Sequence, residues 1–240
     1  MQRLDKYCTA LLGSRTKAQE AIASGCVKIN GKIICKNATI LNSDDKVDIE
    51  MQDLLLGRGG YKLRGFIEEL NTQGYFSNSY LLDKRILDIG SSTGGFTQVL
   101  LESGAKEIIC VDVGKNQLHK SLRQNERIKV FEECDVRNFE DKIGFDVIVC
   151  DVSFISLYKL IDTFKRLNAR DYIWLFKPQF EVGKEAKRNK KGVLKNKDIA
   201  NKALDTFCQY VQNDFRILHI KQSLLKGKEG NEEFFIYATR

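Results

Sequence analysis

The residues of this chain best suited to chemistry are three aspartates and a lysine, each at the end of a short apolar run. Asp112 and Asp135 follow the second and third of these runs, and Asp151 and Lys177 follow the fourth and fifth. Because parallel strands end at one edge of their sheet, and ligands bind there, we expect these side chains to line one site. Carboxylates beside an amine are suited to binding hydroxyl groups and to moving a proton.

The first apolar run ends in a glycine-rich turn, within Arg85-Ile-Leu-Asp-Ile-Gly-Ser-Ser-Thr-Gly-Gly-Phe-Thr97. Its glycines let the backbone approach a ligand, and its serine and threonine side chains are expected to cap the following helix. Asp112 lies 22 residues after Gly90, a spacing at which a carboxylate reaches ribose hydroxyls in nucleotide-binding folds. The glycine spacing is not the GxGxxG of dinucleotide sites, so S-adenosylmethionine, which carries no phosphate, fits better.

We therefore predict an S-adenosylmethionine site at the glycine turn and the strand ends beside it. Asp112 is expected to accept hydrogen bonds from both ribose hydroxyls, and Asp135 to read the adenine amino group. The predicted cofactor-binding residues are Asp88, Gly90, Ser91, Ser92, Thr93, Gly94, Gly95, Phe96, Asp112, Val113, Asp135, Val136 and Asp151.

The elements that must position these residues alternate between strand and helix patterns. Strands are predicted at 85–89, 107–112, 128–132, 145–150, 172–176, 215–222 and 234–239. Helices are expected between the first five strands, and the last two strands are expected to be antiparallel neighbours. The pattern predicts an α/β fold with a doubly wound sheet.

Residues 2–50 are expected to form a separate small α+β module. A first helix begins at Arg3, and Ser14 is expected to cap a second helix that ends at Gly25. Asn30-Gly31 between two apolar runs predicts a tight hairpin, and a last strand is expected at 45–50. Residues 51–61 are a short junction, and we place the domains at 1–56 and 57–240.

Composition restricts the class of protein. The chain has 240 residues and a formal net charge of +7. It has no apolar run of about 18 residues and no signal-peptide core at its N-terminus, so neither a transmembrane helix nor secretion is expected. Seven single cysteines indicate free thiols in a cytoplasmic protein, and two histidines 100 residues apart do not predict a metal site. The basic stretch from Lys184 to Lys202 is suited to contacting phosphates.

Residues 2–50 resemble the S-four-type RNA-binding domain. The matching residues are Arg3-Leu-Asp, Ser14-Arg15, Ala18, Gly25-x-Val27-x-x-Asn30-Gly31 and Asp45-x-Val47. The resemblance implies a basic face that grips structured RNA through its phosphates, and such RNA is read by shape more than by base edges. The alternative for this segment is a helix-hairpin dimerisation module.

The chain as a whole resembles the TlyA-type haemolysin/rRNA methyltransferases, which join that module to an FtsJ-like methyltransferase domain. The segments that carry the resemblance are Gly57-Arg-Gly-Gly-Tyr-Lys62, Asp88-Ile-Gly-Ser-Ser-Thr-Gly-Gly-Phe96, Val111-Asp-Val-Gly114, Asp151-Val-Ser-Phe-Ile-Ser156, Phe176-Lys-Pro-Gln-Phe-Glu-Val-Gly-Lys184 and Gly230-Asn-Glu-Glu-Phe234. It implies a Rossmann-like class I methyltransferase sheet of seven strands. It also implies S-adenosylmethionine-dependent methylation of the ribose 2′-hydroxyl of cytidines in ribosomal RNA.

The family's catalytic set falls on Lys62, Asp151, Lys177 and Glu233. The adjacent Glu232 is the alternative to Glu233, and on a strand the two side chains point to opposite faces. The expected partner is ribosomal RNA or a ribosomal subunit, and the oligomeric state stays open. The short chain, without long extensions, favours the form restricted to large-subunit RNA. The expected RNA-binding residues are Arg3, Arg15, Lys17, Lys28, Lys32, Lys36, Arg58, Lys184, Lys187 and Arg188.

The residue types also fit this chemistry on their own. A ribose hydroxyl is a poor nucleophile, and a lysine can take its proton if neighbours and burial lower the pKa of the amine. Val-Ser-Phe follows Asp151 where exocyclic amine methylation has a Pro-Pro-aromatic motif, and Cys150 lacks the preceding proline of carbon-5 methylation. Two alternatives stay open: an RNA-binding assembly factor with a vestigial methyltransferase fold, and a haemolysin.

Overall fold

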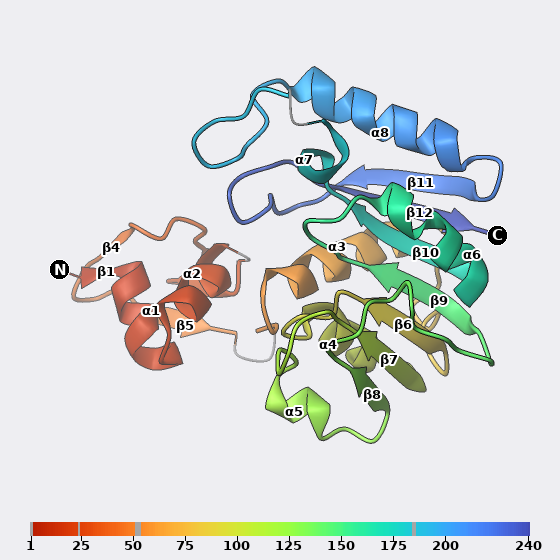
Figure 1. The fold of residues 1–240 in the computed structure, drawn as a ribbon. Helices are drawn as coiled ribbons and strands as arrows, with labels where there is room; N and C mark the ends of the chain where they lie inside the picture. Colours follow the sequence, from red (N-terminus) through yellow and green to blue (C-terminus); the bar gives the residue numbers. More distant parts are fainter. Residues whose placement is uncertain (1, 24, 51–53, 184–185) are drawn as a thin grey trace.

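A small N-terminal module and a larger α/β domain make up the computed structural model, which describes residues 2–23, 25–50, 54–183 and 186–240 (Figure 1). The elements of the module are β1 (Gln2–Arg3), α1 (Leu4–Leu12), α2 (Arg15–Ala23), β2 (Val27–Ile29), β3 (Lys32–Ile33), β4 (Ile40–Leu41) and β5 (Val47–Ile49). β3, β2 and β5 form one antiparallel sheet, and β1 pairs with β4. The predicted helices, hairpin and last strand are confirmed here.

The turn between β2 and β3 shows why the hairpin could be predicted. Asn30 and Gly31 both have positive φ, 51° and 78°, as a tight primed turn requires. Apolar residues of the two helices, among them Leu4 and Ile22, pack with Val27 of β2, and all three are fully buried. The module therefore has an apolar core of its own.

The α/β domain is built on one sheet of seven strands, in the order β11-β12-β10-β9-β6-β7-β8. The strands are β6 (Arg85–Ile89), β7 (Glu107–Val111), β8 (Ile128–Phe131), β9 (Phe145–Cys150), β10 (Ala169–Phe176), β11 (Arg216–Gln222) and β12 (Phe234–Thr239). β6 to β10 run parallel, and β11 and β12 are antiparallel neighbours, as predicted. β12 also pairs antiparallel with β10, which the sequence had not indicated.

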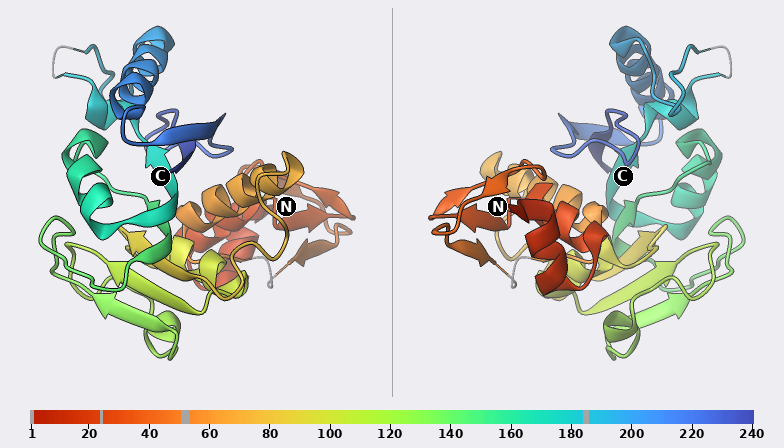
Figure 2. Two further views of the ribbon diagram at one scale, coloured as in Figure 1. Left: turned by 90° about the vertical axis from the view of Figure 1, so that its right-hand side faces the viewer. Right: turned by 90° about the vertical axis from the view of Figure 1, so that its left-hand side faces the viewer.

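Helices cover both faces of this sheet (Figures 1 and 2). They are α3 (Arg58–Thr72), α4 (Gly95–Glu102), α5 (Lys120–Arg123), α6 (Ile161–Leu167), α7 (Pro178–Glu181) and α8 (Lys197–Val211). Alternate residues of β10 pack into the apolar cores on the two faces of the sheet, because successive side chains of a strand point to opposite faces. Trp174 packs with Phe164 and Phe207, whereas Ile173 belongs to the core beneath α3 and α4.

Two local expectations were wrong. A helix was expected between the third and fourth strands, but residues 132–144, all described, form turns and bends. Serine and threonine side chains were expected to cap the helix after the glycine turn, but its N-cap is Gly94 with φ of 97°. A Cβ at Gly94 would lie 2.3 Å from the Leu122 side chain, so close packing explains the glycine.

Helix α3 meets α4 through paired glycines near their first turns. A Cβ added at Gly95 would lie 2.7 Å from the backbone nitrogen of Gly60, so the two helix starts touch without side chains between them. Tyr61 then faces the small module, where the Cys26 thiol donates to its hydroxyl at 3.8 Å. α3 thus connects the small module to the carboxyl edge of the sheet.

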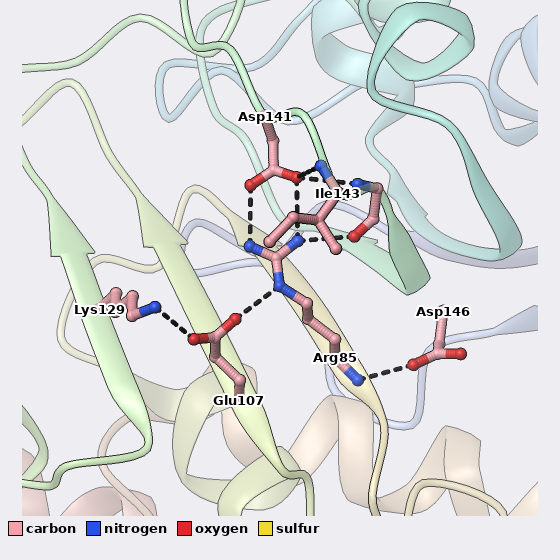
Figure 3. Close-up of polar contacts among 7 residues, drawn as sticks. Arg85, Glu107, Lys129, Asp141, Ile143 and Asp146 are labelled. Carbon is pink, nitrogen blue, oxygen red and sulfur yellow. Dashed lines mark hydrogen bonds and ion pairs between the residues drawn. The ribbon is translucent and has the colours of Figure 1, made fainter.

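A charged cluster around Arg85 closes the amino edge of the sheet (Figure 3). The guanidinium donates two hydrogen bonds to Asp141, at 2.8 and 3.0 Å, and one to Glu107 at 2.5 Å. Asp141 also accepts from the backbone of Ile143 and Gly144, and Glu107 binds Lys129 at 2.5 Å. The cluster joins β6, β7 and β8 to the segment before β9.

Candidate active site

A cavity of about 650 Å³ opens at the carboxyl ends of β6, β7 and β9. Seven of the thirteen predicted cofactor-binding residues line it: Gly90, Ser92, Asp112, Val113, Asp135, Val136 and Asp151. The other six, Asp88, Ser91, Thr93, Gly94, Gly95 and Phe96, lie behind the turn or at the start of α4 and are not part of the lining. Three of the four strand-end residues, Asp112, Asp135 and Asp151, thus line one cavity, and Lys177 is not part of the lining.

The glycine turn allows two strand ends to lie close together at the cavity. Gly90 has φ of 80°, and a Cβ there would lie 2.6 Å from the carbonyl oxygen of Asp151. A side chain at this position would therefore collide with the backbone that follows β9, so the glycine lets β6 and β9 end close together. The volume of the cavity fits an adenosyl group with its amino acid tail, and the aspartates at the rim fit its hydroxyl and amino donors.

Two of the rim aspartates are already held in place by hydrogen bonds. Asp112 accepts from the backbone N–H groups of Ser92 at 2.8 Å and Gly114 at 2.7 Å, which orients its carboxylate. Asp135 is bound by Arg137, through the backbone N–H at 2.9 Å and the guanidinium at 2.5 Å. The Arg137 guanidinium lowers the pKa of Asp135. Asp135 must therefore share its carboxylate with Arg137 if it is to read an adenine.

Asp88 is fully buried beneath the turn and takes no part in the cavity surface. Its Oδ2 accepts from the Thr97 hydroxyl at 2.6 Å, while its Oδ1 has no hydrogen-bond partner among the described residues. Burial raises the pKa of Asp88 to about 7, and the nearby charges of Asp151 and Asp112 add to that effect. Asp88 thus supports the turn from inside.

Lys177 lies directly after β10, at the edge of the cavity, and is 7% exposed. Its ammonium donates to the Ser153 hydroxyl at 2.9 Å and lies 2.5 Å from Asp151 Oδ1, in an ion pair without hydrogen-bond alignment. Pro178 begins α7 and, having no N–H, ends the strand at this point. One buried lysine is therefore held beside the cavity by a carboxylate of the next strand.

A second buried pair lies next to the first. The Lys62 ammonium, on α3, donates to Glu233 Oε2 at 2.6 Å, and the two residues are 7% and 3% exposed. Glu232 instead binds the exposed Lys197 at 2.7 Å. The side chain of Glu233, and not that of Glu232, thus points to Lys62, in agreement with the choice made from the sequence.

The sheet register brings the two pairs together. Phe176, just before Lys177, is opposite Phe234, just after Glu233, on the paired strands β10 and β12. Gln179 lies one turn further, and its amide donates to Glu233 Oε1 at 3.5 Å. Two lysines and two carboxylates that are distant in sequence thus meet at adjacent strand ends.

Sequence reasoning missed several residues of the cavity wall. Arg137, Gln117, Ser153 and Phe154 line it and were not among the predicted site residues. Phe154 is 92% exposed, has φ of 66° and lies near Phe180, with ring centroids 5.2 Å apart. A large apolar side chain exposed on a left-handed backbone cannot be recognised from sequence.

The basic residues expected to bind RNA fall into two groups. Arg15, Lys17, Lys32, Lys36 and Lys187 are exposed. Arg3, Lys28, Arg58 and Arg188 are engaged by Asp5, Glu50, the Lys226 carbonyl and carbonyls around α7, respectively. Lys184 lies outside the described residues. The structure brings the first group to the surface and uses the second, at least in part, for internal contacts.

Two features are absent from the part of the chain that the structure describes. No group of three or more histidine, cysteine or carboxylate side chains there is arranged to hold a metal ion. No helix there is long and apolar enough to cross a membrane.

Both parts of the chain match known families. Residues 55–240 match the FtsJ-like methyltransferase family, and residues 2–47 match the S4 domain. The exact boundary between the two parts, which we placed after residue 56, stays a prediction.

Several relatives match this chain across both of its parts. The 23S rRNA (cytidine-2′-O)-methyltransferase TlyA of Campylobacter jejuni is 41% identical over 98% of each chain. Hemolysin A of Brachyspira hyodysenteriae is 35% identical, again over 98% of each chain. The 16S/23S rRNA (cytidine-2′-O)-methyltransferase TlyA of Mycobacterium tuberculosis is 33% identical over 95% of this chain and 85% of its own.

Solved structures agree with this assignment. A hemolysin-type protein of Streptococcus thermophilus superposes with a TM-score of 0.71 and 31% identity, over 100% of this chain and 88% of the other. An S-adenosylmethionine-dependent methyltransferase of Mesorhizobium loti, 14% identical, shares the fold over 74% of this chain and 100% of its own, with a TM-score of 0.51. The seven-stranded sheet is thus the class I methyltransferase sheet. With an S4 domain before it, the chain belongs to the FtsJ-like methyltransferase family, among the TlyA-type rRNA methyltransferases.

Proposed function

We propose that this protein transfers the methyl group of S-adenosylmethionine to the ribose 2′-hydroxyl of a cytidine in ribosomal RNA. The observation that supports it most is the pair of buried lysine–carboxylate contacts, Lys177 with Asp151 and Lys62 with Glu233, at one end of the sheet. Relatives that cover nearly the whole chain are named for this reaction.

The cavity residues suit the cofactor. When bound, S-adenosylmethionine supplies an electrophilic methyl group on a sulfonium. We assign Asp112 to the ribose hydroxyls, Asp135 to the adenine amino group, and the bare backbone at Gly90 to close contact with the ligand. Asp151 lies on the cavity wall and also pairs with Lys177, so the binding site and the lysine share one residue.

Lys177 is the residue that we assign to the substrate hydroxyl. Its Nζ would receive the proton of the 2′-hydroxyl as the oxygen attacks the methyl carbon, so the amine must first be neutral. Asp151 and Ser153 hold Nζ in place, and Glu233 holds Lys62, so alignment supplies much of the rate.

The rim of the cavity suits a nucleotide substrate. The exposed ring of Phe154 offers a face on which a base can stack, and such stacking is worth about 1–3 kcal/mol per base. The exposed Arg15 and Lys17 of the small module fit a role in gripping RNA phosphates. We infer that the substrate is large-subunit RNA, because the relative with the highest of the identities above is named for 23S rRNA. An enzyme acting on ribosomal RNA works in the cytoplasm.

Nucleoside mass spectrometry tests this proposal. Purified protein is incubated with S-adenosylmethionine and unmodified 50S subunits, 23S rRNA or 16S rRNA. A methyl group on the ribose fragment of cytidine, with an unchanged base fragment, is expected from the large-subunit substrates. A methylated base would contradict the ribose assignment. No transfer to any of these substrates would favour the assembly-factor alternative.

A further inference from the structure

Two lysine-rich loops of the methyltransferase domain are tied together beside Glu233. Together these two loops are called the lysine arm, which consists of residues 186–197 and 223–231 (Figure 1). Asn231, 7% exposed, joins the loops: its Oδ1 accepts from Leu194 N at 3.1 Å, and its Nδ2 donates to the Gly192 carbonyl at 3.4 Å. Because one side chain bridges the two backbones, the loops form one unit.

The outer surface of the arm is strongly cationic. Its exposed lysines are Lys187, Lys190, Lys191, Lys195 and Lys197 in the first loop, and Lys226 and Lys228 in the second. Lys197 and Lys226 both approach Glu232, at 2.7 and 3.9 Å, which brings the two loops close at a second point. Within the arm itself Glu229 is the single acidic residue, so positive charge dominates the surface.

Arg188 anchors the base of the arm to α7. Its guanidinium donates to the carbonyl oxygens of Gln179, Val182, Gly183 and Ala186, at 2.9–3.4 Å. These carbonyls belong to the last turn of α7 and the residues after it, directly after Lys177. The arm is therefore fixed to the element that follows the lysine assigned to the substrate.

The inner end of the arm touches Glu233. Ser223 N donates to the Glu233 carbonyl at 2.8 Å, and Gly227 N donates to the Asn231 carbonyl at 2.8 Å. A Cβ added at Gly227 would lie 2.5 Å from Glu233 Oε1, so the backbone of the loop lies against the carboxylate that holds Lys62. Any shift of the loop must therefore move this carboxylate.

We propose that the lysine arm is a second RNA-binding surface, which binds phosphates that flank the target nucleotide and, through Gly227, positions Glu233. The inference rests on the proposed function in that its ligand is the phosphodiester backbone of ribosomal RNA. Seven exposed lysines on a paired-loop scaffold match a polyanion without regard to base sequence. Gly227 acts through Glu233 and is a positioning residue.

The RNA-binding role of the lysine arm is tested by measuring RNA affinity, without methyl transfer. Lys191→Gln with Lys228→Gln removes one charge from each loop, and Lys106→Gln with Lys142→Gln is the matched control among exposed lysines outside the arm. The affinity for a protein-free 23S rRNA fragment is measured as a function of salt. The arm pair is expected to reduce the log–log salt slope by about 1.4–1.8, as two phosphate contacts require, and the control to leave it unchanged. Equal slopes for the two pairs would overturn the assignment of the arm to RNA binding. The arm would then be assigned to binding another protein.

The positioning role is tested by Gly227→Ala, since no positive φ at Gly227 opposes alanine. kcat is expected to fall at least 10-fold, with unchanged affinities for RNA and S-adenosylmethionine. In a Glu233→Gln background the same change should add less than a 2-fold loss, because the contact it disturbs is already altered. Equal losses in both backgrounds would show that Gly227 does not act through Glu233.

Asn231→Ala is a second variant for the case that Gly227→Ala does not fold. It removes the side chain that joins the two loops of the arm. Separation of the loops should reduce both the salt slope and kcat while cofactor affinity stays the same. An effect on neither would overturn the single-unit arm. These binding measurements remain informative even if wild-type protein methylates no RNA, which would reject the proposed function separately.

Discussion

The two ends of the central sheet both carry charged clusters, but they are built in opposite ways. At the amino edge, the Arg85 guanidinium donates to Asp141, Glu107 and the Gly144 carbonyl, and Asp141 accepts from further backbone groups. At the carboxyl edge, Lys177 and Lys62 are each paired with one carboxylate. Asp88 Oδ1 and Gln179 Oε1 are buried there without a hydrogen-bond partner in the described part of the chain.

The difference separates a structural cluster from a functional one. Where most donors and acceptors are used, the cluster contributes to stability and offers few free groups to a ligand. Where buried polar groups remain unmatched, the fold carries a cost in stability, which indicates a cluster that is not built for stability alone. Substitutions at the two ends should therefore separate stability from activity.

The largest effect is expected at Lys177. Lys177→Ala should reduce methyl transfer by about 10²–10⁴-fold, because the proton of the attacking hydroxyl loses its acceptor. Binding of cofactor and RNA should persist, since the contact matters mainly in the transition state. Lys177→Arg should not restore activity, because a guanidinium does not give up a proton. Transfer of a labelled methyl group measures this, and an active arginine variant would contradict the proton-acceptor role.

The opposite outcome is expected at Arg85. Arg85→Met should lower the free energy of unfolding by about 3 kcal/mol, because it leaves Asp141 and Glu107 without their central partner. Lys84→Met, next in the sequence with a 3.6 Å ion pair to Asp146, should cost no more than about 0.5 kcal/mol. Denaturant titration measures both, and methyl transfer by the folded fraction should stay near wild type. If Arg85→Met lost activity without losing stability, the separation of a structural amino edge from a functional carboxyl edge would be contradicted.

A smaller effect is expected in the cofactor cavity. Asp112→Asn should weaken S-adenosylmethionine binding by about 1.5–3 kcal/mol, because a charged acceptor for hydroxyl groups is lost. Asp135→Asn should cost less, since Arg137 already binds that carboxylate. Calorimetry compares the two variants, and equal losses would show that Arg137 does not compete for Asp135.

The last effect concerns Asp88 and pH. Its pKa, raised from 3.8 to about 7, means that the folded chain binds more protons than the unfolded chain between these values. Stability due to this group should therefore fall as pH rises from about 4 to about 7, and level off above. Asp88→Asn cannot ionise, so it should lose less stability over that range. Melting temperatures from pH 5 to pH 8.5 test this, and parallel profiles would contradict the buried-carboxyl account.

The sheet was the most predictable part of the molecule. β6, β9 and β12 have the predicted bounds because strands buried on both faces appear as continuous apolar runs. The stretch 132–144 was misjudged because its residues allow a helix, whereas contacts with β6 and α6 determine its turns. Asp141, for example, is held by Arg85, and its neighbour Phe139 by Arg166.

The site was predictable where it follows strand ends and unpredictable where it depends on loops. Asp112, Asp151 and Lys177 directly follow apolar runs. Once these runs are recognised as parallel strands, the three residues are expected at the carboxyl edge of the sheet. The resemblance suggested Lys62 and Glu233, but their contact spans 171 positions and required the three-dimensional structure. Asn231 and Gly227 act through tertiary contacts with distant loops, for which local sequence carries no pattern.

The position of β12 has a consequence for the order in which the site forms. β12 follows β11 in the sequence, yet it lies inside the sheet between β11 and β10, and Glu233, just before it, contacts Lys62. The Lys62–Glu233 contact therefore depends on the insertion of β12 between its two neighbours. Contacts of such long sequence separation also form late in folding, because loop closure is costly. The Lys62–Glu233 pair is thus completed only when β12 enters the sheet.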